Sequence, residues 1–81
     1  MNLYLLFQNE NDRYDTYDSC VVIAESEELA KLIHPNGDKW NGEWEQFGNY
    51  SWAHPDNVKV KLLGTSVDSK EQVVLASFNA G

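Results

Sequence analysis

One cysteine and two histidines are the side chains best suited to metal binding or covalent catalysis. Cys20, His34 and His54 could together supply three zinc ligands, but they lack the short paired spacing of a zinc site. A cysteine and a histidine are also the minimum for a thiol nucleophile, yet no helix N-terminus lies near Cys20 in the sequence to activate its thiol. We therefore expect a buried thiol, two loop histidines, and no metal or other cofactor.

Carboxylates elsewhere in the chain suggest calcium binding or proton transfer. One group of oxygen ligands comprises Asn9, Asn11, Asp12, Asp15 and Asp18. This group lacks the glycine and the final glutamate that an EF-hand loop has at fixed positions. Glu43 and Glu45 could form an acid–base pair, but such pairs are common by chance in so acidic a chain. There is also no glycine-rich phosphate loop, and the sequence predicts a protein that is not an enzyme.

Acidic and aromatic residues occur together in two segments, a composition typical of protein-binding surfaces. The candidate partner-binding residues are Asp12, Tyr14, Asp15, Tyr17 and Asp18 in the first segment, and Glu43, Trp44 and Glu45 in the second. Tyrosine offers a large contact area with few rotatable bonds, and carboxylates steer a basic partner. The alternative for each residue is structural, because a tyrosine can pack on a sheet and aspartates can solvate a loop.

The chain is strongly acidic, with thirteen acids, six bases and a net charge of −7. Residues 1–57 carry eleven acids and three bases, a net charge of −8, whereas residues 58–81 carry two acids and three bases, a net charge of +1. Such a surface repels nucleic acids and anionic membranes. It serves either solubility, the commoner reason, or attraction to a partner protein with a basic surface.

Hydrophobic periodicity predicts four strands and one helix in a single domain over residues 1–81. The predicted strands are Leu3–Gln8, Ser19–Glu25, the alternating run from Val58 that stops at Gly64, and Gln72–Phe78. The first strand is apolar at nearly every position, as in a central strand covered on both faces, and we expect it to pair antiparallel with the second. The predicted fold class is α+β, a four-stranded antiparallel sheet with one helix on one face.

The helix and the aromatic segment after it connect the second and third predicted strands. Ser26 is a suitable N-cap, and Leu29 and Ile33 fall on one face of a helix of two to three turns. The helix is expected to end before Pro35, because the residue preceding a proline avoids helical backbone angles. Residues 36–57 combine turn residues with five large aromatics, so we expect an ordered excursion. At least two of its three tryptophans should form a satellite core that closes one end of the sheet.

Hydropathy and cysteine content predict a cytoplasmic protein. The longest apolar runs are only a few residues, too short to span a membrane. The N-terminal residues lack the basic region and the cleavage site of a signal peptide. The single cysteine excludes an internal disulfide, which fits a reducing compartment.

Five segments in order carry a resemblance to other proteins: "LYLL", "YDTYDSCVVIAESEELAKLIHP", "GDKWNGEW", "VKVKLLG" and "VLASFNAG". Over nearly the whole chain they resemble small uncharacterised acidic proteins of bacteriophage and prophage genomes, and the strand-to-helix segment and the "ASFNAG" ending are the most specific. The resemblance implies a mobile genetic element as the source and a partner in the host cell. Several small acidic phage proteins inhibit host defences, CRISPR systems included, and some imitate the charge of DNA.

Three functional hypotheses follow from these observations. The leading one is a non-enzymatic interaction protein that binds and inhibits a host protein, such as a defence nuclease, by occupying basic positions that otherwise hold phosphates. The alternative is a structural or assembly homodimer with no inhibitory role, paired edge to edge through the C-terminal segment "VVLASFN". A third hypothesis is sequestration of a small ligand in an aromatic pocket.

Overall fold

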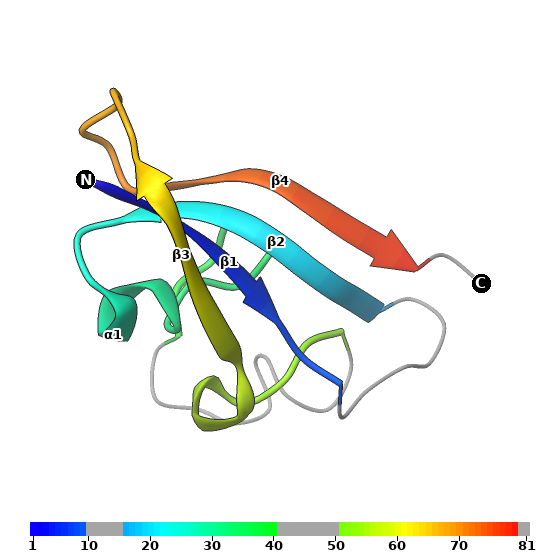
Figure 1. Cartoon of the computed structure of the whole chain (residues 1–81). Helices are drawn as coiled ribbons and strands as arrows, with labels where there is room; N and C mark the ends of the chain where they lie inside the picture. Colours follow the sequence, from blue (N-terminus) through cyan, green and yellow to red (C-terminus); the bar gives the residue numbers. More distant parts are fainter. Residues whose placement is uncertain (10–15, 41–50, 80–81) are drawn as a thin grey trace.

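The chain folds as a four-stranded antiparallel sheet with one short helix, which confirms the predicted α+β class (Figure 1). The computed structural model describes residues 1–9, 16–40 and 51–79. The strands are β1 (Asn2–Phe7), β2 (Thr16–Ala24), β3 (Lys59–Thr65) and β4 (Gln72–Asn79). Their order in the sheet is β3-β1-β2-β4, so β1 and β2 are central and β3 and β4 are the edges.

The central pair forms as the sequence predicts, but β2 begins earlier than expected. β1 and β2 pair antiparallel, with Leu5 opposite Val21. β2 begins at Thr16, three residues before the predicted start, because its first residues pair with the end of β4. Tyr17 lies opposite Phe78 in this extension, and the register shifts between Tyr17 and Ser19. A shift of this kind, a β-bulge, changes which face the preceding residues occupy.

Helix α1 (Glu27–Ala30) is a single turn, shorter than the two to three turns that the sequence predicts. Ser26 caps it as expected, since its side chain accepts a hydrogen bond from the backbone N–H of Leu29 at 3.2 Å. The helix ends early because the residues that follow pair with a returning segment. His34 donates its backbone N–H to the carbonyl of Asp38 at 2.7 Å, and Trp40 donates its own to Leu32 at 2.8 Å.

The core lies between one face of the sheet and the chain that follows β2. Its buried residues are Tyr4, Leu6, Cys20, Val22, Ala24, Ala30, Ile33, Trp52, Ala53 and Val58. Trp52 is completely buried, and Trp40 packs against the same core. Two of the three tryptophans therefore pack in or against the main core, not in the separate satellite core that the sequence predicts, and Trp44 lies outside the described residues. A short 3-10 helix, η1 (Pro55–Asn57), leads into β3 and was not predicted from the sequence.

The second face of the sheet carries several exposed or half-buried apolar side chains. α1 and the segment after it lie behind the sheet in Figure 1, on the side of the core. Leu5 on the other side of β1 is half-buried, and Phe7 is 36% exposed. The expectation that β1 is covered on both faces is therefore wrong, because in the described part of the chain α1 and the segments after it pack on one face only. Within the described ranges, no helix has the length and hydropathy needed to cross a lipid bilayer.

Candidate protein-interaction site

The end of β2 and the end of β4 bring two of the predicted partner-binding residues next to an aromatic neighbour. The ring centroids of Tyr17 and Phe78 lie 4.8 Å apart in a tilted arrangement. Tyr17 is half-buried, whereas Phe78 is 48% exposed and Asp18 is exposed. We call these three residues the aromatic corner. The exposed ring of Phe78 offers apolar contact area, and Asp18 offers a negative charge. Both features favour contact with a basic protein.

Tyr17 contributes to the core as well as to this corner. Its ring makes an edge-on contact with the ring of His34, at a centroid distance of 5.7 Å, and it packs against the core residues. The structural role that the sequence allowed for each tyrosine therefore applies to Tyr17. The other candidate residues lie outside the described part of the chain: Asp12, Tyr14, Asp15, Glu43, Trp44 and Glu45.

Phe78 was missed as a candidate because the strand order is not visible in the sequence. It lies sixty-one positions after Tyr17 in the sequence, within a segment predicted only as the last strand. It could have been found only by predicting that the start of β2 pairs with the end of β4. That pairing depends on β4 adding to β2 and not to β3, a non-local choice.

His34 is a buried structural residue. It is 2% exposed, and its Nδ1 accepts a hydrogen bond from the backbone N–H of Asn36 at 3.0 Å. Because Nδ1 accepts, the neutral ring carries its proton on Nε2, which lies 3.1 Å from the hydroxyl oxygen of Ser51. Burial lowers the pKa of His34, and the negative charge of Asp38 opposes part of that change. The ring is therefore uncharged at neutral pH.

Cys20 is also unsuited to chemistry at neutral pH. It is 2% exposed and lies opposite Leu6 and Ala76 in the sheet. Burial raises the pKa of its thiol to about 12. The thiolate, which is the nucleophile and metal ligand, is therefore almost absent at pH 7. Among the described residues, no three His, Cys, Asp or Glu side chains gather closely enough to hold a metal ion.

The other histidine and the nearest ion pair belong to the connections around the core. His54 packs edge-on against Trp40 at a centroid distance of 5.1 Å, and its Nδ1 accepts the backbone N–H of Asp56 at 3.1 Å. Lys39 pairs with Glu71 at 2.6 Å, just before β4. Residues 1–57 contain three bases, of which Lys39 is one. Its ion-pair partner, Glu71, does not belong to either of the two acidic candidate segments.

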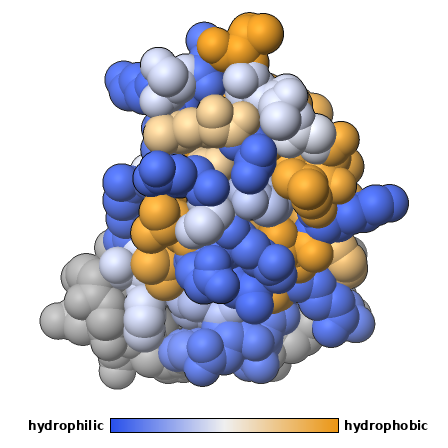
Figure 2. Space-filling view, turned by 60° about the vertical axis from the view of Figure 1, so that its left-hand side comes forward, coloured by the Kyte–Doolittle hydropathy of each residue, from blue (hydrophilic) through white to orange (hydrophobic). Residues whose placement is uncertain are grey.

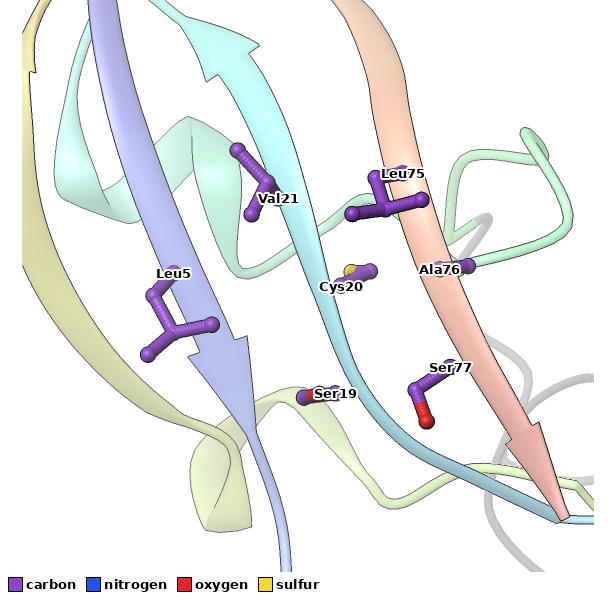
Figure 3. Close-up of a pocket in the computed structure, with 7 residues that line it drawn as sticks. All are labelled: Leu5, Ser19, Cys20, Val21, Leu75, Ala76 and Ser77. Atoms are coloured by element: carbon purple, nitrogen blue, oxygen red, sulfur yellow. The ribbon is translucent and has the colours of Figure 1, made fainter.

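The uncovered face of the sheet carries a second possible contact surface. A hollow of about 250 Å³ lies among Leu5, Ser19, Cys20, Val21, Leu75, Ala76 and Ser77, on strands β1, β2 and β4 (Figure 3). Apolar side chains gather along the right-hand side of Figure 2, the side to which the front of Figure 1 is turned. The sequence does not predict this surface, because apolar residues at both even and odd positions of β1 indicate a strand that is covered on both faces.

Comparisons with known proteins add no relative from which a function could be transferred. No protein family matches the chain, and neither a curated protein nor a solved structure shows significant similarity to it. The functional argument therefore rests on the surfaces of the chain itself, namely the aromatic corner and the uncovered face of the sheet.

Proposed function

We propose that this chain is a non-catalytic protein-binding module that engages a basic surface of a host protein through the aromatic corner. The observation that carries the proposal is the ring pair of Tyr17 and the 48% exposed Phe78, with the exposed Asp18 next to Tyr17 in the sequence. The ring of Phe78 is held by Tyr17, so its contact area needs little ordering on binding. A rigid aromatic surface next to an acid is well suited to arginine and lysine side chains.

The segment that precedes β2 in the sequence is acidic. Residues 10–15 contain three acids and one base and lead directly into Thr16. Together with the net charge of −7, they favour fast association with a basic partner and disfavour contact with nucleic acid. The proposed mechanism is competition: carboxylates of this chain pair with arginine and lysine side chains of the partner that otherwise bind the phosphates of nucleic acid.

The resemblance to bacteriophage and prophage proteins supports a host target of this kind. A defence nuclease has a basic surface that must bind nucleic acid, so an acidic protein that covers it acts as an inhibitor. The burial of Cys20 and His34 in structural contacts supports a role without catalysis. The proposed function is therefore anti-CRISPR-like inhibition of a defence nuclease or a related host protein.

Charge reversal at the acidic surface tests this proposal against a matched control. The double variant Asp15→Lys/Asp18→Lys and the control Asp56→Lys/Asp68→Lys both raise the net charge by four, from −7 to −3. Asp56 and Asp68 are exposed and lie in connections away from the aromatic corner. Affinity capture from a bacterial host lysate uses the wild type and both variants as bait.

We expect the wild type and the control to recover the same basic protein, and the Asp15/Asp18 variant to lose it. The recovered complex should dissociate steeply as the salt concentration rises, since exposed charges are screened within about 8 Å at physiological ionic strength. Equal recovery by the two variants, or a partner that resists high salt, would refute binding through this surface. Recovery of no protein by the wild type would refute the proposed function itself.

A further inference from the structure

The uncovered side of the sheet is a continuous, mostly apolar surface, which we call the open face. Residues opposite each other in antiparallel strands share a face, so the register assigns its members. The accessible members of the open face are Leu3, Leu5, Phe7, Ser19, Val21, Lys59, Lys61, Leu75 and Ser77. The row at one end also contains Gly64, Ile23 and Gln72, but Ile23 is only 3% exposed and is not available for contact. These cross-strand rows contain no acidic residue, although the chain as a whole has more than twice as many acids as bases.

The centre of the open face is aliphatic and hollow. Leu5, Val21 and Leu75 form one cross-strand row, and all three line the hollow of about 250 Å³ (Figure 3). Leu75 is 68% exposed, so an apolar side chain projects beside an apolar depression. Burying the exposed side chain of Leu75 against apolar atoms would lower the free energy by about 25 cal/mol for each Å² of apolar surface removed from water.

We propose that a second copy of this chain packs on the open face, so that two sheets form a two-fold sandwich. A strand such as β1, which is apolar on both of its faces, is typical of a sheet with a layer on each side. The chain supplies one of these layers through α1 and the core around Trp52. A second sheet at about 10 Å supplies the other in the aligned packing of sandwiches.

The size of the open face fits a weak but specific dimer. Strands about 4.8 Å apart, with a rise of about 3.3 Å per residue, give a face of roughly 20 Å by 20 Å with its side chains. Burying it removes about a tenth of the 4997 Å² surface of each copy, or roughly 1,000 Å² in total. This area is at the lower limit of specific interfaces, so we expect a dissociation constant on the order of micromolar.

The charges on the open face favour a second copy arranged about one particular axis. The charged residues of its rows are Lys59 and Lys61, both on the edge strand β3. A two-fold axis parallel to the strands places β3 over β4 of the other copy, so the lysines of the two copies lie on opposite rims. This arrangement separates the two lysine pairs, whereas an axis across the strands would place β3 over β3. Since each copy has a net charge of −7, the apolar centre must supply the attraction, and the dimer should be more stable at high salt. The result is an apolar centre with a polar rim, as in protein interfaces generally.

The central test compares two exposed leucines on opposite faces of the sheet. Leu75 is 68% exposed on the open face, whereas Leu62 is 60% exposed and lies opposite Tyr4, on the side of the core. Both are on edge strands, so either can be changed to lysine without burying the new charge in a monomer. Sedimentation velocity of the wild type, Leu75→Lys and Leu62→Lys is measured from about 1 μM to about 1 mM, the range that brackets a micromolar dissociation constant. Circular dichroism establishes that each variant is folded.

We expect the wild type and Leu62→Lys to become dimers as concentration rises, and Leu75→Lys to dissociate about tenfold more readily or to remain monomeric. A monomeric wild type over the whole range would overturn the proposal. So would a dimer that persists unchanged in Leu75→Lys, as edge-to-edge pairing through β4 would give, because that pairing leaves Leu75 in solvent. A wild type that binds only a different protein on this face would also refute a second copy as its occupant.

A second pair of variants tests the orientation of the two-fold axis and leaves the apolar centre of the open face unchanged. Ser77 is exposed on the open face, in the same cross-strand row as Lys59. An axis parallel to the strands brings Ser77 of one copy over Lys59 of the other. Ser77→Glu should therefore tighten the dimer and Ser77→Lys weaken it, with a larger difference at low salt. Equal affinities for the two variants, or the reverse order, would refute this arrangement. This proposal does not depend on binding at the aromatic corner.

Discussion

Burial changes the pKa values of Cys20 and His34 in opposite directions, and both changes favour the uncharged side chain. The thiol pKa rises to about 12 and the imidazole pKa falls, because in each case the charged form would lose its hydration. The sequence predicted the thiol correctly as a buried apolar group but placed both histidines in loops without a structural role. The hydrogen bonds from Asn36 and to Ser51 could not be anticipated, since they depend on how the connection folds back under the sheet.

The state of Cys20 predicts slow alkylation of the native protein. With a thiol pKa of about 12, the thiolate fraction at pH 8 is roughly a thousand times smaller than that of a free cysteine with a pKa of about 8.5. Labelling with iodoacetamide at pH 8, followed by mass spectrometry, should therefore be complete only after denaturation. Labelling of the folded chain at the rate of a free thiol would contradict this account of Cys20.

The state of His34 predicts a loss of stability in mild acid. Because its pKa is lower in the folded chain than in the unfolded chain, the unfolded chain binds the proton more readily. The stabilisation is fully present above a pH of about 6.5 and decreases as the pH falls toward the folded pKa. The free energy of unfolding should therefore decrease from pH 7.5 to pH 5 more in the wild type than in His34→Gln. That variant should itself be about 1–3 kcal/mol less stable at pH 7.5. Parallel pH curves for the two proteins would show that His34 is not responsible.

At the scale of elements, the strands follow from local patterns, whereas their edges and bulges do not. The alternation in β3 and the β-branched run in β2 were sufficient to predict both strands. The extension of β2 to Thr16 depends on pairing with β4, which is distant in the sequence. The helix was predicted too long because its apolar spacing continues to Ile33, while the competing bridge between Ile33 and Lys39 is a tertiary contact.

The N-cap Ser26 should contribute measurably to the stability of the protein, although α1 is only one turn long. Ser26→Ala removes the acceptor for the N–H of Leu29 in a helix of one turn, which should cost about 1 kcal/mol of the free energy of unfolding. Ser69→Ala, in the exposed connection between β3 and β4, is the matched control and should change stability by less than about 0.5 kcal/mol. Urea denaturation of both variants measures the difference. Equal stabilities would mean that packing alone holds α1 in place.

At the scale of the whole molecule, the sequence predicts part of one candidate surface and not the other. The acidic and aromatic content around Tyr17 and Asp18 indicated a contact surface, but the third member of the aromatic corner, Phe78, depended on strand order. The open face could not be predicted, because the apolar character of β1 on both faces indicates a strand that is covered on both faces. Its exposure depends on tertiary packing, since the described segments after β2 gather around Trp52 on the other face of the sheet.

The central claim is that the open face of the sheet is buried against a second copy of the chain. The most direct measurement is an isotope-filtered NMR experiment on a mixture of methyl-labelled and unlabelled wild-type protein at about 1 mM, well above a micromolar dissociation constant. We expect intermolecular contacts from the methyl groups of Leu5, Val21 and Leu75, and none from Leu62. The absence of contacts from the first three residues, or contacts from Leu62 instead, would contradict the account.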